Sequence, residues 1–408
     1  MKPLRFCALI LVMAMVAVAA SAGAQEPKKL SLQSALDLAS RQNLDLLAAR
    51  AQRAVAQAGV KIAKQIPNPT ASVAVLRDTP HESLFFDQQL EIGGRRGRRI
   101  ELARQEGALT EVDIATLERQ VRRNVREAFY NLALARGASS QRGQALKLAE
   151  RLHDIAQARF EAGDVPQLEV VQSELEVSRA RADFQVAQQE EKVALSELNA
   201  LLNAPAATDW QLEGPLDSLP PQIPLAELVD RATASNAELQ RVAQEQKVEK
   251  SRQSLFEAER IPNLGIEFGT DFNAPHEFNV GPRGQVTMEL PIFTRNQGEI
   301  AQSRASQHAL GSEAEATRRA VAGRVESAYF ELDARRAEVD LYHRNVVPVT
   351  ERLESMAEES YRAGKGSILT VLDAQRNVQQ VQQEYLQSLF NAQLSFARLE
   401  ETVGAPLD

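Results

Sequence analysis

Histidine and glutamate stand side by side at two corresponding places in the chain, Pro80-His81-Glu82 and Pro275-His276-Glu277. Imidazole and carboxylate groups both bind divalent transition metals. The two pairs therefore predict weak contacts with divalent cations. Solvated loop residues or a turn-shaping motif would show the same pattern.

The sequence otherwise lacks the patterns of an enzyme. It contains no HExxH, no CxxC and no pair of histidines four residues apart, so no metal site is firmly assigned. No nucleophile with a base and no phosphate loop is present. The only cysteine, Cys7, lies in the N-terminal leader, which leaves the mature chain without a disulfide. We predict a protein that is not an enzyme and needs no cofactor.

The elements that position these residues occur twice. Ile66-Pro67-Asn68 recurs as Ile261-Pro262-Asn263, and Leu90 to Ile100 resembles Leu290 to Ile300. Each copy has about two hundred residues, far more than a solenoid repeat, which indicates a duplicated domain. The predicted division is a signal peptide at 1–24, a first repeat at 25–205, a linker at 206–223 that holds Trp210, and a second repeat at 224–408.

The leader has the pattern of a secretory signal. Lys2 and Arg5 precede an apolar run, and Ala22-Gly23-Ala24 follows as a cleavage site. A membrane anchor is the alternative, but spanning a bilayer takes about 20 apolar residues. No later run approaches that length, so the mature chain would enter a membrane as β-strands. The net charge of −8 argues against nucleic acid as a partner.

Helical periodicity covers most of each repeat and predicts long helices in coiled-coil-like contact. Gly137 and Gly143 are candidate interruptions, and Pro348 is a candidate bend. Helices are predicted at 31–66, 95–159, 167–202, 296–362 and 367–403, with hairpin tips at about 160–167 and 361–368.

Between these helices the period changes to two, at about 70–92 and about 263–292. Leu264, Ile266 and Phe268 alternate with Gly265 and Glu267. Such strands suit a transmembrane barrel, and a soluble hairpin lying on the helices would alternate in the same way. The predicted polar face carries Asp87, Glu91, Glu267, Asp271 and Glu289. Arg95, Arg96, Arg98 and Arg99 follow the strands, where they would meet interfacial phosphates or neighbouring carboxylates.

Four strands cannot close a barrel, and an open sheet edge in lipid leaves backbone groups unsatisfied. Two chains would supply eight strands, whose interior side chains would fill the space, whereas three would supply twelve around an aqueous lumen. We therefore predict a mainly helical protein with a small transmembrane β part. Its trimer would form a 12-stranded β-barrel that a long periplasmic α-helical barrel continues.

The helix–strand–strand–helix layout and both hairpin tips resemble the TolC family of outer-membrane channel proteins, over essentially Ser31 to Leu407. Short motifs, Leu90 to Arg96 and Leu290 to Ile300, are similar to the CzcC-like branch that serves heavy-metal export. The resemblance implies a homotrimeric duct in the outer membrane of a Gram-negative bacterium, in contact with lipid and extending into the periplasm. A periplasmic adaptor (membrane fusion) protein would dock on the tips, and an inner-membrane resistance-nodulation-division (RND) pump would supply the energy.

The resemblance also implies a gate at the tips. Asp373 matches an aspartate that rings the narrow entrance, Tyr361 matches a gate tyrosine, and Glu169 matches its acidic partner, beside the tip glycines Gly163 and Gly364. Three copies of the aspartate would attract cations and raise one another's pKa. The alternative is a surface carboxylate near a helix N-terminus.

Two positions depart from the family's gate. Thr370 replaces a second ring aspartate, and Gly366 replaces a gate arginine. The gate network is therefore only half present in this chain.

The leading functional interpretation is the outer-membrane component of a tripartite RND efflux system that exports cobalt, zinc or cadmium cations. In its trimer the outer loops would carry six His–Glu pairs. One alternative is the same duct serving drug efflux or type I secretion. Another is a soluble periplasmic coiled-coil adaptor, which would lack four alternating strands in matched pairs.

Overall fold

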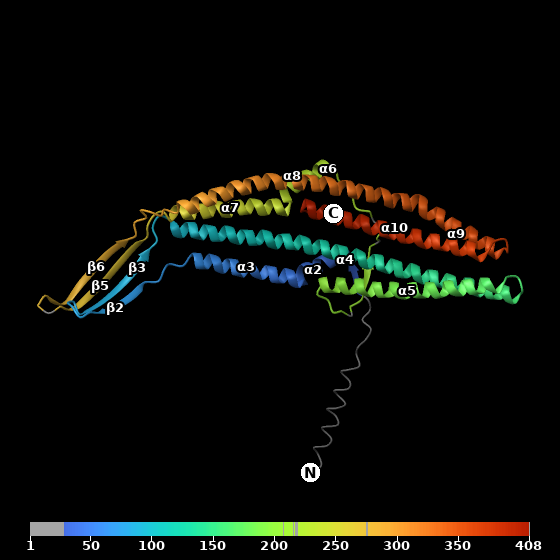
Figure 1. The fold of residues 1–408 in the computed structure, drawn as a ribbon, viewed down its shortest axis with the longest axis horizontal. Coiled ribbons are helices and arrows are strands. Elements are labelled where there is room, and N and C mark those ends of the chain that lie inside the picture. The colour runs from blue at the N-terminus through green and yellow to red at the C-terminus, as the bar shows by residue number, and fades with distance from the viewer. Residues whose placement is uncertain (1–27, 207, 215, 217–218, 275, 408) are drawn as a thin grey trace, which may run out of the picture. The chain divides into compact units, whose positions relative to one another are not determined.

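The computed structural model is mainly helical, with two pairs of long strands (Figure 1). It describes residues 28–206, 208–214, 216, 219–274 and 276–407, so the predicted signal peptide and Pro275 lie outside the described residues. Within the described part of the chain, no helix has the length and apolar character that crossing a membrane would take.

Each repeat places two strands between pairs of helices, as predicted. The first contains α2 (Leu32–Gln42), α3 (Leu44–Ala63), β2 (Thr70–Val75), β3 (Glu82–Leu90), α4 (Arg95–Glu161) and α5 (Gln167–Leu201). The second contains α6 (Leu225–Ser235), α7 (Ala237–Ala258), β5 (Leu264–Ala274), β6 (Phe278–Met288), α8 (Gln297–Leu341), η1 (Tyr342–Val346), α9 (Val347–Arg362) and α10 (Ile368–Val403).

The sequence predicted a single first helix at 31–66. This prediction is wrong in one respect, because an asparagine divides the helix into α2 and α3. Ser31 caps α2 with a capping box, and Asn43 then leaves the helical conformation, with ψ at 126°. Its Nδ2 donates to the carbonyl of Leu201 at 3.0 Å. Asn236 does the same between α6 and α7, where its Nδ2 donates to the carbonyl of Thr402 at 2.7 Å and its Oδ1 accepts from the backbone N–H of Glu238 at 2.9 Å. An asparagine breaks the helix at the same place in both repeats.

The candidate interruptions of the two long helices have different outcomes: those at the glycines are absent, and the one at Pro348 is present. Helix α4 runs unbroken through Gly137 and Gly143. A Cβ at Gly137 would lie 3.1 Å from Leu386, and one at Gly143 would lie 3.1 Å from Phe184, so both glycines allow close helix packing. The second long helix is interrupted just before Pro348 by the π-helical turn η1, because proline cannot donate the usual backbone hydrogen bond.

The connector between the repeats contains a strand that the sequence analysis did not predict. Residues Trp210–Glu213 form β4, which pairs in parallel with β1 (Lys28–Ser31). Trp210 is buried, and its indole Nε1 donates to Asn199 Oδ1 at 2.6 Å. The connector is therefore attached to the helices beside it.

The four long strands form one antiparallel sheet in the order β2-β3-β5-β6. Facing residues on paired strands share a face of a sheet, and the register places every exposed large apolar residue that the structure describes on these strands on a single face. They are Val73, Val75, Phe86, Leu90, Ile266, Phe268, Val280, Val286 and Met288. The predicted alternation towards Ile292 ends early, at Met288, which pairs with Leu264, the first residue of β5.

The chain divides into two compact units, and each takes segments from both repeats. Unit 1 comprises Met1–Asn43, Asn124–Pro220 and Arg335–Leu394, and unit 2 comprises Leu44–Arg123, Pro221–Ala334 and Ser395–Asp408. Unit 1 contains both hairpin tips. Unit 2 contains the sheet and a core in which α6, α8 and the end of α10 meet around Leu228, Val325 and Phe396.

Candidate functional site

Both hairpin tips turn at a glycine. Gly163 has φ +83° and Gly364 has φ +71°, a conformation that other residues adopt at a cost. A Cβ at either position would meet nothing within 4 Å, so the backbone conformation and not the space requires glycine. The N–H of Gly364 donates to the carbonyl of Tyr361 at 3.0 Å, and the next N–H closes the helix end on Ser360 at 2.9 Å.

The two tips pack against each other within unit 1. Leu152 and Ala156 of α4 share a buried core with Ala357 of α9 and Ile368 and Leu372 of α10. In Figure 1 the α4–α5 and α9–α10 hairpins end side by side. The sequence analysis predicted both tips but not their shared core, since a single periodic pattern does not show which helices meet.

Three of the tip residues meet in what we call the tyrosine latch, Arg159, Glu169 and Tyr361. Tyr361 is 0% exposed, and its hydroxyl donates to Glu169 Oε2 over 3.4 Å. The Arg159 guanidinium lies over the tyrosine ring, 4.9 Å from its centroid. Burial, followed by the nearby Glu169 charge, raises the pKa of Tyr361, so the hydroxyl keeps the proton that it donates. The structure thus brings together the predicted gate tyrosine and its acidic partner, and adds an arginine that the sequence analysis had not singled out.

Asp373 lies elsewhere on the tip and faces solvent. Its side chain is 70% exposed, and Arg376 Nη1 lies 3.5 Å from its Oδ1. Arg376 also binds Glu176 at 2.9 Å, and that hydrogen bond raises the pKa of the guanidinium. Because the Arg376 guanidinium is shared between Glu176 and Asp373, it compensates the negative charge of the exposed Asp373 only in part. The ring of three such residues stays a prediction.

The predicted cation loops lie at the far end of the sheet from the helices. Glu82 begins β3 and accepts from Asn273 Nδ2 at 3.3 Å, and the N–H of His81 donates to the Asn273 carbonyl at 3.4 Å. His276 and Glu277 lie in the β5–β6 turn, where His276 adopts φ +77°. No three His, Cys, Asp or Glu side chains among the described residues are grouped to hold a metal ion. Weak cation contact at these loops stays a prediction.

The polar face of the sheet carries carboxylates, as the alternation predicted. Asp87 and Glu267 are direct cross-strand neighbours, and Asp271 accepts from Ser83 Oγ at 2.7 Å. Like charges facing each other across two strands are unfavourable, and a passing cation would relieve the repulsion. Glu91 follows the end of β3 and pairs with Arg99, so it is not free on this face.

Three of the arginines after the sheet, Arg95, Arg96 and Arg99, bind carbonyls at the ends of helices. Arg99 donates to the carbonyl of Ala63 at 3.0 Å, Arg96 to that of Lys64 at 2.7 Å, and Arg95 to that of Glu259 at 3.1 Å. These carbonyls close α3 and α7, where cationic side chains complement the helix dipole. The arginines hold the helices at the base of the sheet.

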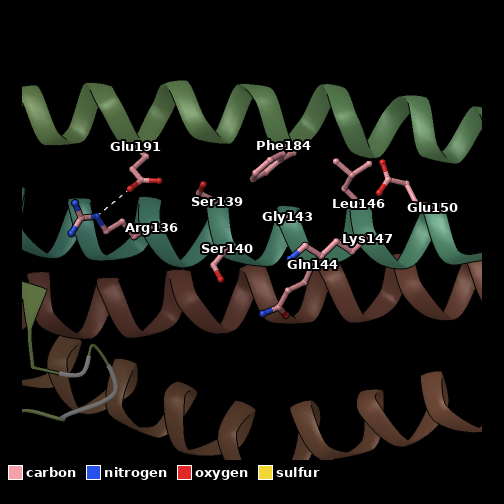
Figure 2. Close-up of a pocket in the computed structure, with 10 residues that line it drawn as sticks. All are labelled: Arg136, Ser139, Ser140, Gly143, Gln144, Leu146, Lys147, Glu150, Phe184 and Glu191. Atoms are coloured by element: carbon pink, nitrogen blue, oxygen red, sulfur yellow. Dashed lines mark hydrogen bonds and ion pairs between the residues drawn. The ribbon is translucent and has the colours of Figure 1, made fainter. Parts of the chain in front are cut away.

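A cleft of about 670 Å³ lies between α4 and α5 and had no sequence signal (Figure 2). Arg136 at one end binds Glu191 at 3.1 Å, and Phe184 lies over Gly143 at its centre. Arg136 also pairs with Asp209 at 2.6 Å. Two carboxylates of the chain therefore balance the charge of Arg136. The cleft results from the packing of α4 and α5 around Gly143.

Comparison with known proteins shows which family this arrangement of helices and strands belongs to. The model of the family described as outer membrane efflux protein matches residues 35–204 and 228–405. A solved structure of CusC, described in connection with transmembrane channel formation, superimposes with a TM-score of 0.76 at 17% identity, covering 94% of this chain and 96% of that one.

The names of two curated relatives state metal resistance, and the name of a third states pyoverdine export. The cobalt-zinc-cadmium resistance protein CzcC of Cupriavidus metallidurans is 27% identical over 385 residues, 92% of this chain and 90% of that protein. The pyoverdine export outer membrane protein OpmQ of Pseudomonas aeruginosa is 26% identical over 406 residues, 90% and 82%. The nickel-cobalt-cadmium resistance protein NccC of Alcaligenes xylosoxydans xylosoxydans is 28% identical over 221 residues, 52% and 48%.

A mainly helical chain with two matched strand pairs and one exposed apolar sheet face defines a membrane channel. The chain belongs to the outer membrane efflux protein family. It is the outer-membrane channel of a tripartite efflux system and extends into the periplasm of a Gram-negative bacterium. The predicted TolC-type fold, outer-membrane location and non-enzymatic transport role are confirmed, and the soluble adaptor alternative is wrong.

Proposed function

We propose that this chain forms a homotrimeric duct that releases divalent heavy-metal cations of the cobalt, zinc and cadmium type from the cell. The trimer follows from the sheet edges. β2 and β6 each have one partner in the chain and leave the other edge unpaired. In lipid these backbone groups need partners, and copies of the chain supply them when twelve strands close into one wall.

The similarity to CzcC over 92% of the chain carries the metal assignment. The similarity to NccC over about half the chain supports it. The polar face fits this cargo, because Asp87 and Glu267 lie side by side and Asp271 lies on the same face. Carboxylates lining a pore favour cations over anions.

The partners follow from the architecture of the family. Channels of this family are trimers that assemble with a periplasmic adaptor and an inner-membrane pump. We place the adaptor at the hairpin tips around Gly163 and Gly364, which expose backbone and side chains at one end of unit 1. The pump, of the RND type, supplies the energy, and this chain supplies a passive path.

One observation favours a second candidate function. The similarity to OpmQ covers 90% of the chain at nearly the same identity as that to CzcC, and OpmQ by its name exports pyoverdine. A duct of this fold contacts its cargo through a wide polar lining, so export of a small organic molecule is the competing assignment.

Deletion of the gene in its own host distinguishes export of metal cations from export of a small organic molecule. We expect the deletion strain to become sensitive to cadmium, zinc and cobalt salts and to accumulate more metal, with both effects reversed by the restored chain. A deletion that leaves metal tolerance unchanged while it raises sensitivity to organic compounds, or stops secretion of a siderophore, contradicts the metal assignment and supports the second candidate.

A further inference from the structure

One arginine stands among the carboxylates on the polar face of the sheet. Arg283 of β6 is the only basic residue in the four long strands, and its side chain is exposed. The register places it opposite Gly269 of β5, so its two diagonal neighbours on β5 are Glu267 and Asp271. Diagonal neighbours lie about 7–8 Å apart, a distance that a long side chain can span. An ion pair with either carboxylate is therefore within reach of Arg283.

The guanidinium of Arg283 nevertheless lies over an aromatic ring. Within the described part of the chain it forms no ion pair, and its Cζ lies 5.2 Å from the centroid of the Phe85 ring. Phe85 of β3 also faces Gly269, so an aromatic ring, a glycine and an arginine form one row across three strands. The face of an aromatic ring attracts a cation. This row, which we call the arginine row, holds the positive charge apart from Glu267 and Asp271.

Two glycines of β5 allow this arrangement. A Cβ at Gly269 would lie 2.5 Å from Phe85 Cδ1 and 2.2 Å from a backbone oxygen of β3, so a larger residue would displace the ring. Gly265 lies two residues away on the other side of Glu267, and a Cβ there would lie 3.4 Å from Asp87 Oδ2. The Asp87 carboxylate therefore lies on the side of its row that faces away from the arginine row. The acidic row of Asp87 and Glu267 and the arginine row stay separate.

A positive charge beside an acidic row affects how long a cation stays there. A divalent cation between Asp87 and Glu267 would be held by both carboxylates, whereas conduction requires a site that also releases its ion. The arginine row is two residues away along the strand, or about 7 Å. At that distance in water, one positive charge weakens the binding of a divalent cation roughly sevenfold, and salt reduces the effect.

We propose that Arg283 is a release residue of the duct, whose guanidinium prevents the acidic row from retaining divalent cations. Phe85 is the positioning residue that holds this guanidinium away from Glu267. The inference rests on the proposed passage of divalent cations along the polar face. The competing role is a structural brace that ties β6 to β3 across Gly269. A brace would stabilise the sheet without changing how a cation binds.

Cadmium block of the potassium current in a planar bilayer tests the proposal. For Arg283→Gln we expect half-block at a cadmium concentration roughly three- to sevenfold below that of the wild type, because each protomer loses one positive charge. Arg283→Lys keeps the charge and should behave like the wild type. Phe85→Leu removes the ring and frees the guanidinium to pair with Glu267, so half-block should need more cadmium than in the wild type.

Matched measurements make each outcome decisive. Every variant is first checked for heat-resistant trimers on gels, and Arg231→Gln, the same change on α6, should leave half-block unchanged. Unchanged half-block in Arg283→Gln overturns the proposal, and a lower melting temperature of its trimers would then identify the arginine as a brace. If Arg283→Gln forms no trimers, unchanged half-block in Phe85→Leu overturns the proposal instead.

The reversal potential of the wild type in a potassium chloride gradient separates this inference from the proposed function. A cation-selective wild type whose half-block is the same in Arg283→Gln refutes the release residue and leaves the metal duct standing. A wild type without cation preference refutes both.

Discussion

Removal of one hydroxyl from the tyrosine latch should open the channel. Tyr361→Phe keeps the buried ring and its contact with Arg159 but deletes the hydrogen bond to Glu169, which spans 3.4 Å. A hydrogen bond to a charged group contributes about 1.5–3 kcal/mol, and the long distance puts this one near 1 kcal/mol. If three copies open together, the loss is about 3 kcal/mol, which shifts the closed-to-open ratio by roughly 150-fold.

Planar-bilayer conductance measures this directly. We expect Tyr361→Phe to raise the open fraction and Glu169→Gln, which keeps an acceptor without the charge, to raise it less. Tyr329→Phe makes the same chemical change on α8 of unit 2 and should conduct like the wild type. Wild-type conductance in both Tyr361→Phe and Glu169→Gln would refute the latch.

The latch also has a defined pH dependence. Burial and the Glu169 charge raise the pKa of Tyr361 above its ordinary value of about 10. The hydroxyl donor is therefore fully present below that ordinary pKa and is lost as the pH rises through the raised one. Conductance of the wild type should increase at strongly alkaline pH, and Tyr361→Phe should lack that step.

Four further changes test other parts of the account. Gly93→Ala puts a Cβ 2.6 Å from Ile261 and should reduce the yield of heat-resistant trimers on gels, whereas Gly94→Ala, with the same sign of φ and open space, should reduce it less. Arg99→Ala removes bonds to the carbonyl of Ala63 at the end of α3, to that of Gln65 just beyond it and to Glu91, and should destabilise the end of α3 by roughly 2–3 kcal/mol in hydrogen exchange. Burial, then Glu358 and Glu351, raise the pKa of Glu354, so the stability of α9 should fall as the pH rises through that raised pKa, and Glu354→Gln should abolish the fall in hydrogen exchange. His81→Ala with His276→Ala should lower metal resistance slightly, and unchanged resistance would refute cation contact at the outer loops.

The fold was largely predictable from periodicity because its elements are long and occur twice. The strand pairs, the return helices and both glycine tips followed from spacing alone. The break at Asn43 was missed because its cause, a bond to the end of α5, joins residues far apart in sequence. The pairing of β4 with β1 was missed for the same reason, since four-residue strands carry too little pattern.

The candidate site was predictable in its residues but not in its contacts. Tyr361 and Glu169 came from the family resemblance, and the structure brings them together across two hairpins. Arg159 had no distinguishing signal, because a cation over an aromatic ring depends on helix packing and not on local sequence. The arginines after the sheet were expected at interfacial phosphates or neighbouring carboxylates. Arg99 does pair with the carboxylate of Glu91, but the bonds of these arginines to carbonyls at the ends of α3 and α7 were not predicted, because helix ends leave carbonyls unpaired.

Ion selectivity tests the central claim most directly. The purified chain, reconstituted in a planar bilayer under a gradient of cadmium or zinc chloride, should give a reversal potential close to that of the cation, and Asp87→Asn with Glu267→Gln should move it towards zero. A wild-type potential on the side of chloride, or no conductance from a correctly assembled trimer, would contradict a duct for divalent metal cations.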